Sequence, residues 1–271
     1  MKKIILITGA SSGMGKAFAL RLLKEGHMVY GAARRTERMQ DILEAGGHVV
    51  TMDVTDASAM RTGLDRILAE QGRIDVLINN AGYAIYGSVE ETSMEDVHRQ
   101  FEVNIFGLGQ LTQLVIPHMR AQGSGRIVNI SSMGGRMYTP LGAWYHATKH
   151  ALEGWSDCLR LELAPLGIDV VIIEPGIIKT EFAEVMTGPL LKRSGMGPYG
   201  ELARRVAKGA ENGMATGRGS DPDVVADLVV KAVRARRPRT RYAGGFLARP
   251  VMWMRKWGGD RLFDRVIMKA A

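Results

Sequence analysis

Tyr145 and Lys149 are the two side chains of this sequence whose types and spacing could move a proton. The tyrosine stands four residues before the lysine within residues 129–153, NISSMGGRMYTPLGAWYHATKHALE, and in a helix this spacing puts both side chains on one face. An unperturbed tyrosine titrates near pH ~10, so a tyrosine that acts as a base at neutral pH needs stabilisation of its anion by on the order of 4 kcal/mol. A neighbouring ammonium lowers the pKa in that direction. The pair therefore predicts acid–base chemistry, and the alternative is a chance pairing on a solvated helix face.

Two histidines flank this pair, and their spacing raises the question of a metal. His146 and His150 are four residues apart, as zinc ligands can be, but no glutamate follows His146 in the metalloprotease pattern and no third ligand is evident. We therefore expect no metal site.

A phosphate-binding turn is predicted at the N-terminus. Residues 3–8, KIILIT, have the pattern of a short buried strand, and the run GASSGMG separates them from the helical pattern KAFALRLLKEG. Gly9, Gly13 and Gly15 would let the backbone approach a pyrophosphate bound by the N–H groups at the helix start. The spacing is GxxxGxG and not the GxGxxG of the dinucleotide-binding fingerprint. The glycines alone would also fit a plain turn, so the prediction of phosphate binding depends on the strand before them and the helix after them.

The end of the second predicted strand, residues 27–33, indicates which cofactor would bind. An acidic residue there would hold the ribose 2′-hydroxyl of NAD, whereas this sequence offers Arg34 and Arg35, which could grip a 2′-phosphate. This favours NADP(H) over NAD(H). The alternative is that both arginines belong to a solvated helix start.

Strands and helices then alternate along the chain, which predicts a parallel sheet with both faces covered. A helix is expected over residues 36–45, a strand over 48–53, a helix over 57–70 and strands over 74–80, 126–132 and 168–176. The expected fold is α/β, a single Rossmann-type doubly wound parallel sheet of about seven strands flanked by helices. Residues 1–245 would form this cofactor-binding and catalytic domain, with a mobile lid at about 181–220 and a C-terminal extension at 246–271.

Polar residues at strand ends and inside one helix extend the candidate site. Asp53 could hydrogen-bond an adenine amine or simply cap its strand, and the NNAG run at 79–82 suits either a close cofactor approach or a plain turn. Asn104 interrupts the apolar run of a long helix predicted over 95–121. It would either tie down core backbone or bend the helix to expose a carbonyl.

These motifs, in this order, resemble the short-chain dehydrogenase/reductase family over roughly residues 3–240. The resemblance rests on TGASSGMG at 8–15, NNAG at 79–82, Asn104, Ser132, Tyr145 with Lys149, and PGIIKT at 175–180. It is closest to members that act on lipophilic alcohols and ketones, such as hydroxysteroid and retinol dehydrogenases.

The resemblance implies a role for each matching residue. Tyr145 would be the general acid or base, Lys149 would lower its pKa and bind the nicotinamide ribose, and Ser132 would hold the substrate oxygen. Asn104 would bend its helix and anchor a water of a proton relay. The implied cofactor-binding residues are Thr8, Gly9, Ser11, Gly13, Met14, Gly15, Arg34, Arg35, Asp53, Val54, Asn80, Ala81, Gly82, Tyr145, Lys149, Pro175, Gly176, Ile178 and Thr180.

Two function classes follow. The first is an NADP(H)-dependent oxidoreductase of a lipophilic secondary alcohol or ketone, and the second is a non-catalytic dinucleotide sensor that binds a partner. Several apolar residues would offer an adaptable substrate pocket, although methionines in a lid are also ordinary packing residues. They are Met133, Met137, Leu141, Met186 and Met196. We expect a homo-oligomer, a dimer or a tetramer.

Charge is concentrated in the last third of the chain. Residues 1–180 carry 18 Lys plus Arg against 19 Asp plus Glu, and residues 181–271 carry 18 against 9. The runs RARRPRTR at 234–241 and FLARPVMWMRKW at 246–257 combine basic with aromatic residues, which is typical of a segment on an anionic membrane surface. The equal alternative is packing over the substrate pocket or a subunit partner. Nucleic acid is not expected, because no recognition element accompanies the charge.

Compartment is predicted from cysteine usage and from the lack of a targeting pattern. The chain of 271 residues contains one cysteine, Cys158, so no internal disulfide can form. The apolar run after Lys3 is too short for a signal-peptide core, and no run reaches the ~18 residues of a membrane span. We expect a cytoplasmic protein, with possible peripheral contact to a membrane.

Overall fold

The chain folds around one parallel sheet. The computed structural model describes residues 2–271, except for the side chains of residues 182–185 and 214. The strands are β1 (Ile4–Thr8), β2 (Met28–Ala33), β3 (His48–Thr51), β4 (Val76–Asn79), β5 (Gly125–Ile130), β6 (Ile168–Pro175) and β7 (Arg241–Gly244). Their order is β3-β2-β1-β4-β5-β6-β7, and every neighbouring pair is parallel. The predicted α/β class with a doubly wound sheet of seven strands is confirmed.

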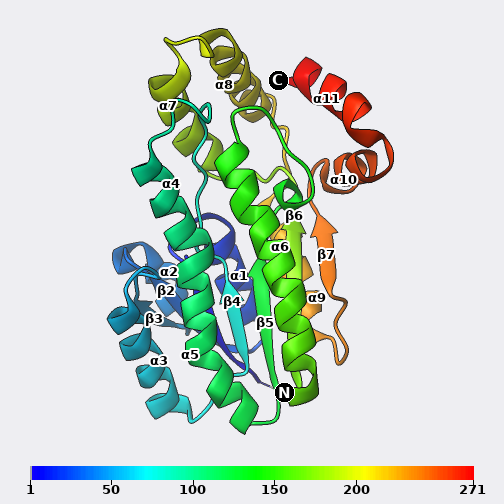
Figure 1. Ribbon diagram of the computed structural model, residues 1–271. Coiled ribbons are helices and arrows are strands. Elements are labelled where there is room, and N and C mark those ends of the chain that lie inside the picture. The colour runs from blue at the N-terminus through cyan, green and yellow to red at the C-terminus, as the bar shows by residue number, and fades with distance from the viewer. Residues whose placement is uncertain (1) are drawn as a thin grey trace.

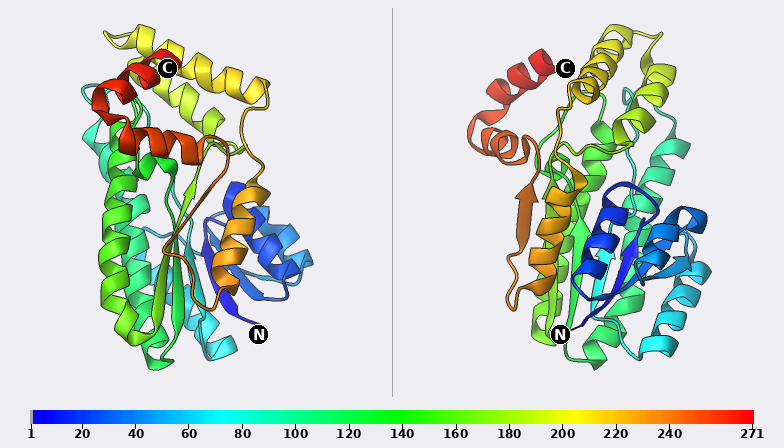
Figure 2. Two further views of the ribbon diagram at one scale, coloured as in Figure 1. Left: turned by 90° about the vertical axis from the view of Figure 1, so that its right-hand side faces the viewer. Right: turned by 180° about the vertical axis from the view of Figure 1, so that it is seen from behind.

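Helices cover both faces of this sheet (Figure 1; Figure 2, right). One face carries α1 (Gly13–Lys24), α2 (Gln40–Glu44) and α9 (Pro222–Arg234), and the other carries α3 (Ala57–Gln71), α5 (Leu108–Ala121) and α6 (Ala143–Leu163). Side chains alternate along β1, so that Ile5 and Ile7 pack with the first set while Ile4 and Leu6 pack with the second. Both faces are buried, which explains why the strands read as continuous apolar runs.

The strand order places a ligand crevice between β1 and β4. The chain moves outward from β1 to β3 in one direction and from β4 to β7 in the other, so the connections after β1 and β4 diverge. In open α/β sheets, ligands bind beyond the carboxyl ends of the strands at this point. The glycine-rich turn after β1 and the NNAG run after β4 both lie there.

The helix predicted over 95–121 is interrupted. The structure has α4 (Met94–Phe101), a π-helical turn (Glu102–Gly107) and then α5. The π turn contains Asn104, the polar residue that interrupts the apolar run in the sequence of this helix. Gly107 ends it, and a Cβ built there would lie 2.0 Å from the Val54 carbonyl oxygen. The helix therefore passes so close to the end of the third strand segment that only glycine fits.

The predicted lid is more regular than expected. Residues 181–220, predicted as a mobile loop with short helical pieces, contain α7 (Phe182–Ser194) and α8 (Gly200–Ala215). Their glycines and Pro189 argued against helices, but Leu190, Ala203 and Ala207 are buried with Leu141 in one cluster. Burial of this apolar face outweighs the weak local propensity.

The C-terminal residues form a helical hairpin, α10 (Ala248–Trp257) and α11 (Gly259–Ala270), beside α8 at the carboxyl end of the sheet (Figure 1). The two basic runs that the sequence presented as neighbours are separated by β7, with residues 235–240 before the strand and 246–257 after it. Arg234 pairs with Glu25, and Arg241 pairs with Glu153 and Asp157. The charge of the last third is therefore not one continuous surface.

Replacing Gly107 with alanine tests the close helix approach. The added methyl group meets the Val54 carbonyl oxygen, and overpacking of this kind costs roughly 1–3 kcal/mol of unfolding free energy. Urea denaturation measures the loss. The matched control is Gly109→Ala in α5, where the nearest atom lies 3.9 Å away and the lower helix propensity of glycine predicts equal or higher stability. Equal stabilities of the two variants would contradict the close approach.

Candidate active site

The glycine-rich turn after β1 is held by direct backbone contact. Gly9 and Gly13 have positive φ angles of 66° and 53°, which glycine adopts without strain. A Cβ at Gly15 would lie 2.3 Å from the Gly9 carbonyl oxygen and 2.4 Å from Asn80 Nδ2. These glycines therefore serve a turn that doubles back on itself, as the sequence predicts for a phosphate loop.

The NNAG run after β4 clamps this turn in place. Asn80 Nδ2 donates to the carbonyl oxygens of Thr8 and Gly9 at 2.9 and 3.2 Å. The backbone N–H groups of Asn80 and Ala81 donate to Thr8 Oγ1 at 3.1 and 3.0 Å. Thr8 and Asn80 thus form hydrogen bonds within the loop region itself. They would support the cofactor site by holding the loop in its conformation.

The loop geometry fits a bound pyrophosphate. Helix α1 begins at Gly13, its first turn contains no acidic residue, and Ser12 makes no side-chain cap, so its N–H groups and positive dipole end are open to an anion. Across the crevice, Thr180 Cγ2 lies 3.6 Å from the Cβ position of Gly13. Thr180, predicted to clamp the nicotinamide end, is therefore next to the phosphate loop.

Arg34 and Asp53 meet at the ends of β2 and β3. Arg34 Nη1 lies 3.9 Å from Asp53 Oδ2, and Asp53 Oδ1 accepts from the N–H and hydroxyl groups of Thr55. Arg34 is largely exposed, so this long ion pair is weak and can be exchanged. Arg35 is also exposed and has no ion pair with the described residues. Both arginines follow the end of β2, where a 2′-phosphate of NADP(H) would be bound in the predicted site.

Ser132 and Tyr145 meet beyond the end of β5, and Lys149 lies four residues after Tyr145 in α6. The Ser132 hydroxyl hydrogen-bonds the Tyr145 phenol, and it also accepts the Gly134 N–H at 3.0 Å. Lys149 Nζ donates to the Ile130 carbonyl oxygen at 2.9 Å. The ammonium of Lys149 is therefore held against strand β5, and its proximity to the Tyr145 phenol stays a prediction from the spacing in α6.

The expected lowering of the tyrosine pKa is wrong for this structure. Burial raises the pKa of Tyr145, and the hydrogen bond from Ser132 opposes this shift without reversing it. Burial also lowers the pKa of Lys149 to about 8, against the opposing charge of Glu153. Desolvation disfavours both charged forms and outweighs their proximity along the helix. Tyr145 is therefore a protonated phenol at neutral pH, suited to donate its proton.

Asn104 ties two segments together from inside the π turn. Its amide oxygen accepts the Tyr83 N–H at 3.1 Å, and its Nδ2 donates to the Tyr83 carbonyl oxygen at 2.9 Å and to Thr148 Oγ1 at 3.1 Å. Of the two roles predicted for Asn104, the structure shows the tie between core segments together with a distorted helix. Its side chain links the run after β4 to α6, one residue from Lys149.

His146 has a role that sequence analysis missed. Its Nδ1 is 2.9 Å from the Gly134 carbonyl oxygen, and its Nε2 accepts the Thr139 N–H at 3.1 Å. These partners require a neutral ring with the proton on Nδ1. Burial lowers the pKa of His146, which is consistent with that form. The ring fastens residues 133–142 to α6, and a Cβ at Gly142 would lie 2.8 Å from its Cδ2.

A cavity of about 780 Å³ opens in front of Ser132 and Tyr145. Residues predicted for substrate and for cofactor share its lining: Met14, Met133, Met137, Pro175, Gly176, Ile178, Thr180 and Met186. Two predicted pocket residues do not line it. Leu141, whose φ is 62°, turns into the cluster with α7 and α8, and Met196 is 97% exposed.

Much of the cavity wall comes from segments that carried no motif. Tyr86, Thr139 and Pro140 contribute from loops, and Lys179 and Arg218 add positive charge at its edge. Helix α8 contributes Val206, Gly209, Ala210 and Gly213, whose three- and four-residue spacing on one face was the available signal. The C-terminal residues Phe246, Leu247, Ile267, Ala270 and Ala271 complete the wall, so the alternative in which this segment packs over the pocket is the one the structure shows.

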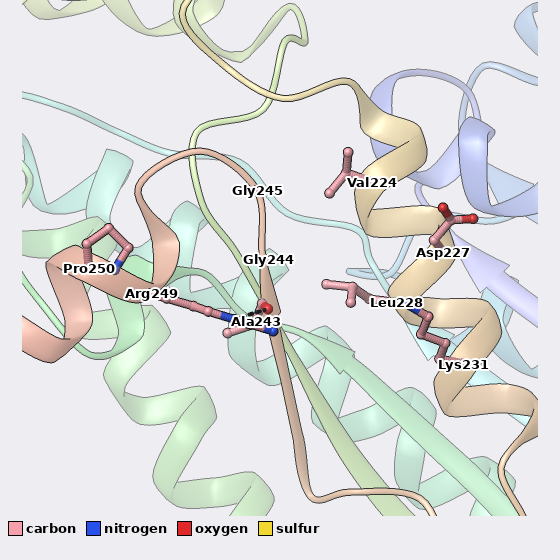
Figure 3. Close-up of a pocket in the computed structure, with 9 residues that line it drawn as sticks. All are labelled: Val224, Asp227, Leu228, Lys231, Ala243, Gly244, Gly245, Arg249 and Pro250. Carbon is pink, nitrogen blue, oxygen red and sulfur yellow. Dashed lines mark hydrogen bonds between the residues drawn. The ribbon is translucent and has the colours of Figure 1, made fainter.

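A second pocket, of about 420 Å³, lies between α9, β7 and the start of α10 (Figure 3). Leu228 packs against Gly244 there, and Arg249 Nε donates to the Ala243 carbonyl oxygen. None of the predicted site residues lines it. Among the described residues, no group of three His, Cys, Asp or Glu side chains is placed to hold a metal ion.

Comparison with known proteins agrees with this geometry. A family model described as short chain dehydrogenase matches residues 3–188. A 3-ketodihydrosphingosine reductase from Bacteroides thetaiotaomicron is 43% identical over 183 residues, which is 67% of this chain and 66% of that protein. The match thus spans slightly less than two thirds of that relative.

Solved structures extend the likeness over most of the chain. A short-chain dehydrogenase from Streptomyces avermitilis is 38% identical with a TM-score of 0.77, covering 90% of this chain and 88% of that one. A serine dehydrogenase complexed with NADP⁺ is 28% identical with a TM-score of 0.79, covering 91% and 96%. The chain belongs to the short-chain dehydrogenase/reductase family.

The buried histidine predicts a pH dependence of stability. The folded state holds the pKa of His146 below its unfolded value of 6.5, so the unfolded chain binds the proton more readily, and stability falls as pH drops below about 6.5. His146→Gln should therefore lose less unfolding free energy between pH 7.5 and pH 5.5 than the parent chain. Burial also lowers the pKa of His27, so part of the dependence of unfolding free energy on pH should remain in the variant.

Urea denaturation at the two pH values checks this. His98→Gln, which removes an exposed imidazole, is the control and should keep the parent slope. An unchanged slope in His146→Gln would show that His146 does not titrate with unfolding.

Proposed function

We propose that this protein is an NADP(H)-dependent oxidoreductase that transfers a hydride between nicotinamide and a lipophilic secondary alcohol or ketone. The observation that carries the proposal is that Ser132 and Tyr145 face a large, mainly apolar cavity whose wall also contains Thr180, the residue beside the phosphate loop. A polar oxygen on an apolar molecule would meet two hydrogen-bond donors at the end of the cavity nearest the cofactor crevice.

Each side chain has a chemical task in this proposal. A nicotinamide cofactor, when bound, exchanges the hydride with the carbonyl carbon. Tyr145 donates its proton to the substrate oxygen during reduction, because burial keeps the phenol protonated. Ser132 hydrogen-bonds the same oxygen. Lys149 would bind the nicotinamide ribose, and Asn104 keeps the helix that carries Lys149 in register.

The choice of NADP(H) over NAD(H) rests on Arg34 and Arg35. Both are exposed at the end of β2, and among the described side chains the one carboxylate paired with either is Asp53, through a long contact. A 2′-phosphate placed there would replace one carboxylate with a doubly charged group that accepts bidentate hydrogen bonds. The NADP⁺ complex of the serine dehydrogenase supports the same choice.

The proposed lipophilic substrate class rests on the residues that line the cavity. Methionines, Ile178, Val206, Phe246 and Leu247 contribute apolar surface, and the reductase relative is named for 3-ketodihydrosphingosine.

We further propose a homo-oligomer, a dimer or a tetramer, in which Phe106 and Leu161, now 56% and 67% exposed, would be covered. A cytoplasmic location, peripheral membrane contact and the absence of nucleic acid binding also remain part of the proposal. No helix among the described residues could cross a membrane.

The competing proposal is a non-catalytic dinucleotide sensor. It explains the phosphate loop but gives no reason for a hydrogen-bonded Ser132 and Tyr145 to face a cavity. The oxidoreductase is therefore favoured.

Tyr145→Phe separates the two functions. Loss of the proton donor should lower kcat roughly 100- to 10,000-fold with little change in cofactor affinity. NADPH absorbance with a panel of apolar ketones measures turnover, and fluorescence titration measures NADPH binding. Tyr199→Phe, which removes a phenol bonded to Glu90, is the control and should keep full turnover. Unchanged turnover in Tyr145→Phe would refute the catalytic role.

Arg34→Ala combined with Arg35→Ala tests the cofactor choice. Loss of two charge-assisted contacts should raise KM for NADPH by roughly 10- to 100-fold and leave KM for NADH nearly unchanged. Arg38→Ala removes an exposed arginine from the same segment and should change neither value. A parent enzyme that prefers NADH would overturn the assignment.

A further inference from the structure

The outer face of α10 exposes two tryptophans. Trp253 and Trp257 are four residues apart on one face of the helix and are 67% and 66% exposed. Arg249 and Lys256 flank them, and Lys256 Nζ lies 4.8 Å from the centre of the Trp257 ring. Two large exposed rings on one helix face form an apolar patch that could bind a partner surface.

The outer face of α11 carries a stripe of cations. Arg261, Arg265 and Lys269 follow one another at four-residue spacing and are all exposed. Leu262 and Met268, at 48% and 44% exposure, lie beside the stripe. Figure 2, left, shows both helices together at the front of the molecule.

The acids of the hairpin are occupied by protein partners. Asp260 pairs with Arg255 at 2.7 Å, and Asp264 accepts the Tyr138 hydroxyl at 2.8 Å. Residues 246–271 contain six Lys or Arg and two Asp. With both acids engaged, Arg261, Arg265 and Lys269 have no ion pair with a described side chain.

The inner face of the same hairpin is fixed to the catalytic body. Phe263 is fully buried, and its ring meets Tyr138 edge-on at 5.1 Å. Arg255 lies over the Tyr138 ring at 5.0 Å. Ile267 and Ala270 continue this inner face into the cavity wall, opposite Gly209 of α8. One helix thus has a cationic outer face and an inner face that touches the substrate space.

We propose that the α10–α11 hairpin binds the surface of an anionic lipid bilayer and presents the cavity to it. Tryptophan rings favour the boundary between headgroups and acyl chains, and unpaired cations are drawn to anionic headgroups. Nucleic acid would satisfy the charge but would leave the aliphatic side chains Leu262 and Met268 exposed. The inference about substrate access rests on the proposed function: an apolar ketone dissolved in the bilayer would reach the cavity on the side where α11 forms its wall.

Vesicle flotation tests the docking surface without using activity. The full chain should float with phosphatidylglycerol-containing phosphatidylcholine vesicles and not with pure phosphatidylcholine. Arg261→Gln, Arg265→Gln and Lys269→Gln together should weaken binding about a hundredfold, since each cation contributes roughly fivefold. The matched control removes the same charge from the loop before β7, through Arg236→Gln, Arg237→Gln and Arg239→Gln, and should keep binding.

A second variant, Trp253→Ser with Trp257→Ser, tests the apolar part, and quenching of tryptophan fluorescence by brominated lipid measures insertion. The parent chain should be quenched and this variant should not. Equal loss of binding in the control, no flotation of the parent, or retention on duplex DNA in place of vesicles would overturn the proposal. Turnover of a water-soluble ketone should persist in all these variants, so loss of docking and failure of the enzyme assignment are distinguishable.

Discussion

Desolvation of the Tyr145 phenol and of the Lys149 ammonium is the constraint on which the proposed chemistry depends. Burial raises the pKa of the phenol and lowers the pKa of the ammonium to about 8, so both neutral forms gain relative to their charged forms. Four-residue spacing alone would favour a phenolate beside an ammonium. The structure reverses that preference, because desolvation acts on each group separately while Lys149 is turned toward Ile130. This supports the proposed role of Tyr145 as a proton donor to a carbonyl oxygen.

Several residues hold this site together, and His146 and Asn104 do so through buried, hydrogen-bonded polar groups. His146 fastens the loop between Ser132 and Tyr145, so that the substrate wall and the proton donor move as one unit. Asn104 joins the same helix to the run after β4, which in turn clamps the phosphate loop through Asn80. These hydrogen bonds, together with the short chain segments between them, link the phosphate loop to the helix that carries Tyr145.

Local features of the site could be predicted from the sequence, and features that depend on packing could not. The phosphate loop was predictable because glycine positions and strand–helix order determine it. The direction of the Tyr145 pKa was not, since it depends on how much protein surrounds the ring. Leu141 was assigned to the pocket from its place between Ser132 and Tyr145, but its positive φ turns it away. Helices α7 and α8 were not predicted because their glycines have low helix propensity. Packing of α8 against its neighbours offsets this unfavourable propensity, and the sequence pattern does not show that packing.

The two functions predicted for the C-terminal segment, membrane contact and packing over the pocket, are compatible in the α10–α11 hairpin. Composition alone presented membrane contact and pocket packing as alternatives for the residues after 245. A helix has more than one face, and α11 points Phe263 and Ile267 inward while Arg261 and Arg265 point outward. Its inner face is fixed by packing, and its outer face has positive charge without acidic partners. The same helix can therefore close the cavity and meet an anionic surface, which would shorten the path of an apolar substrate through water.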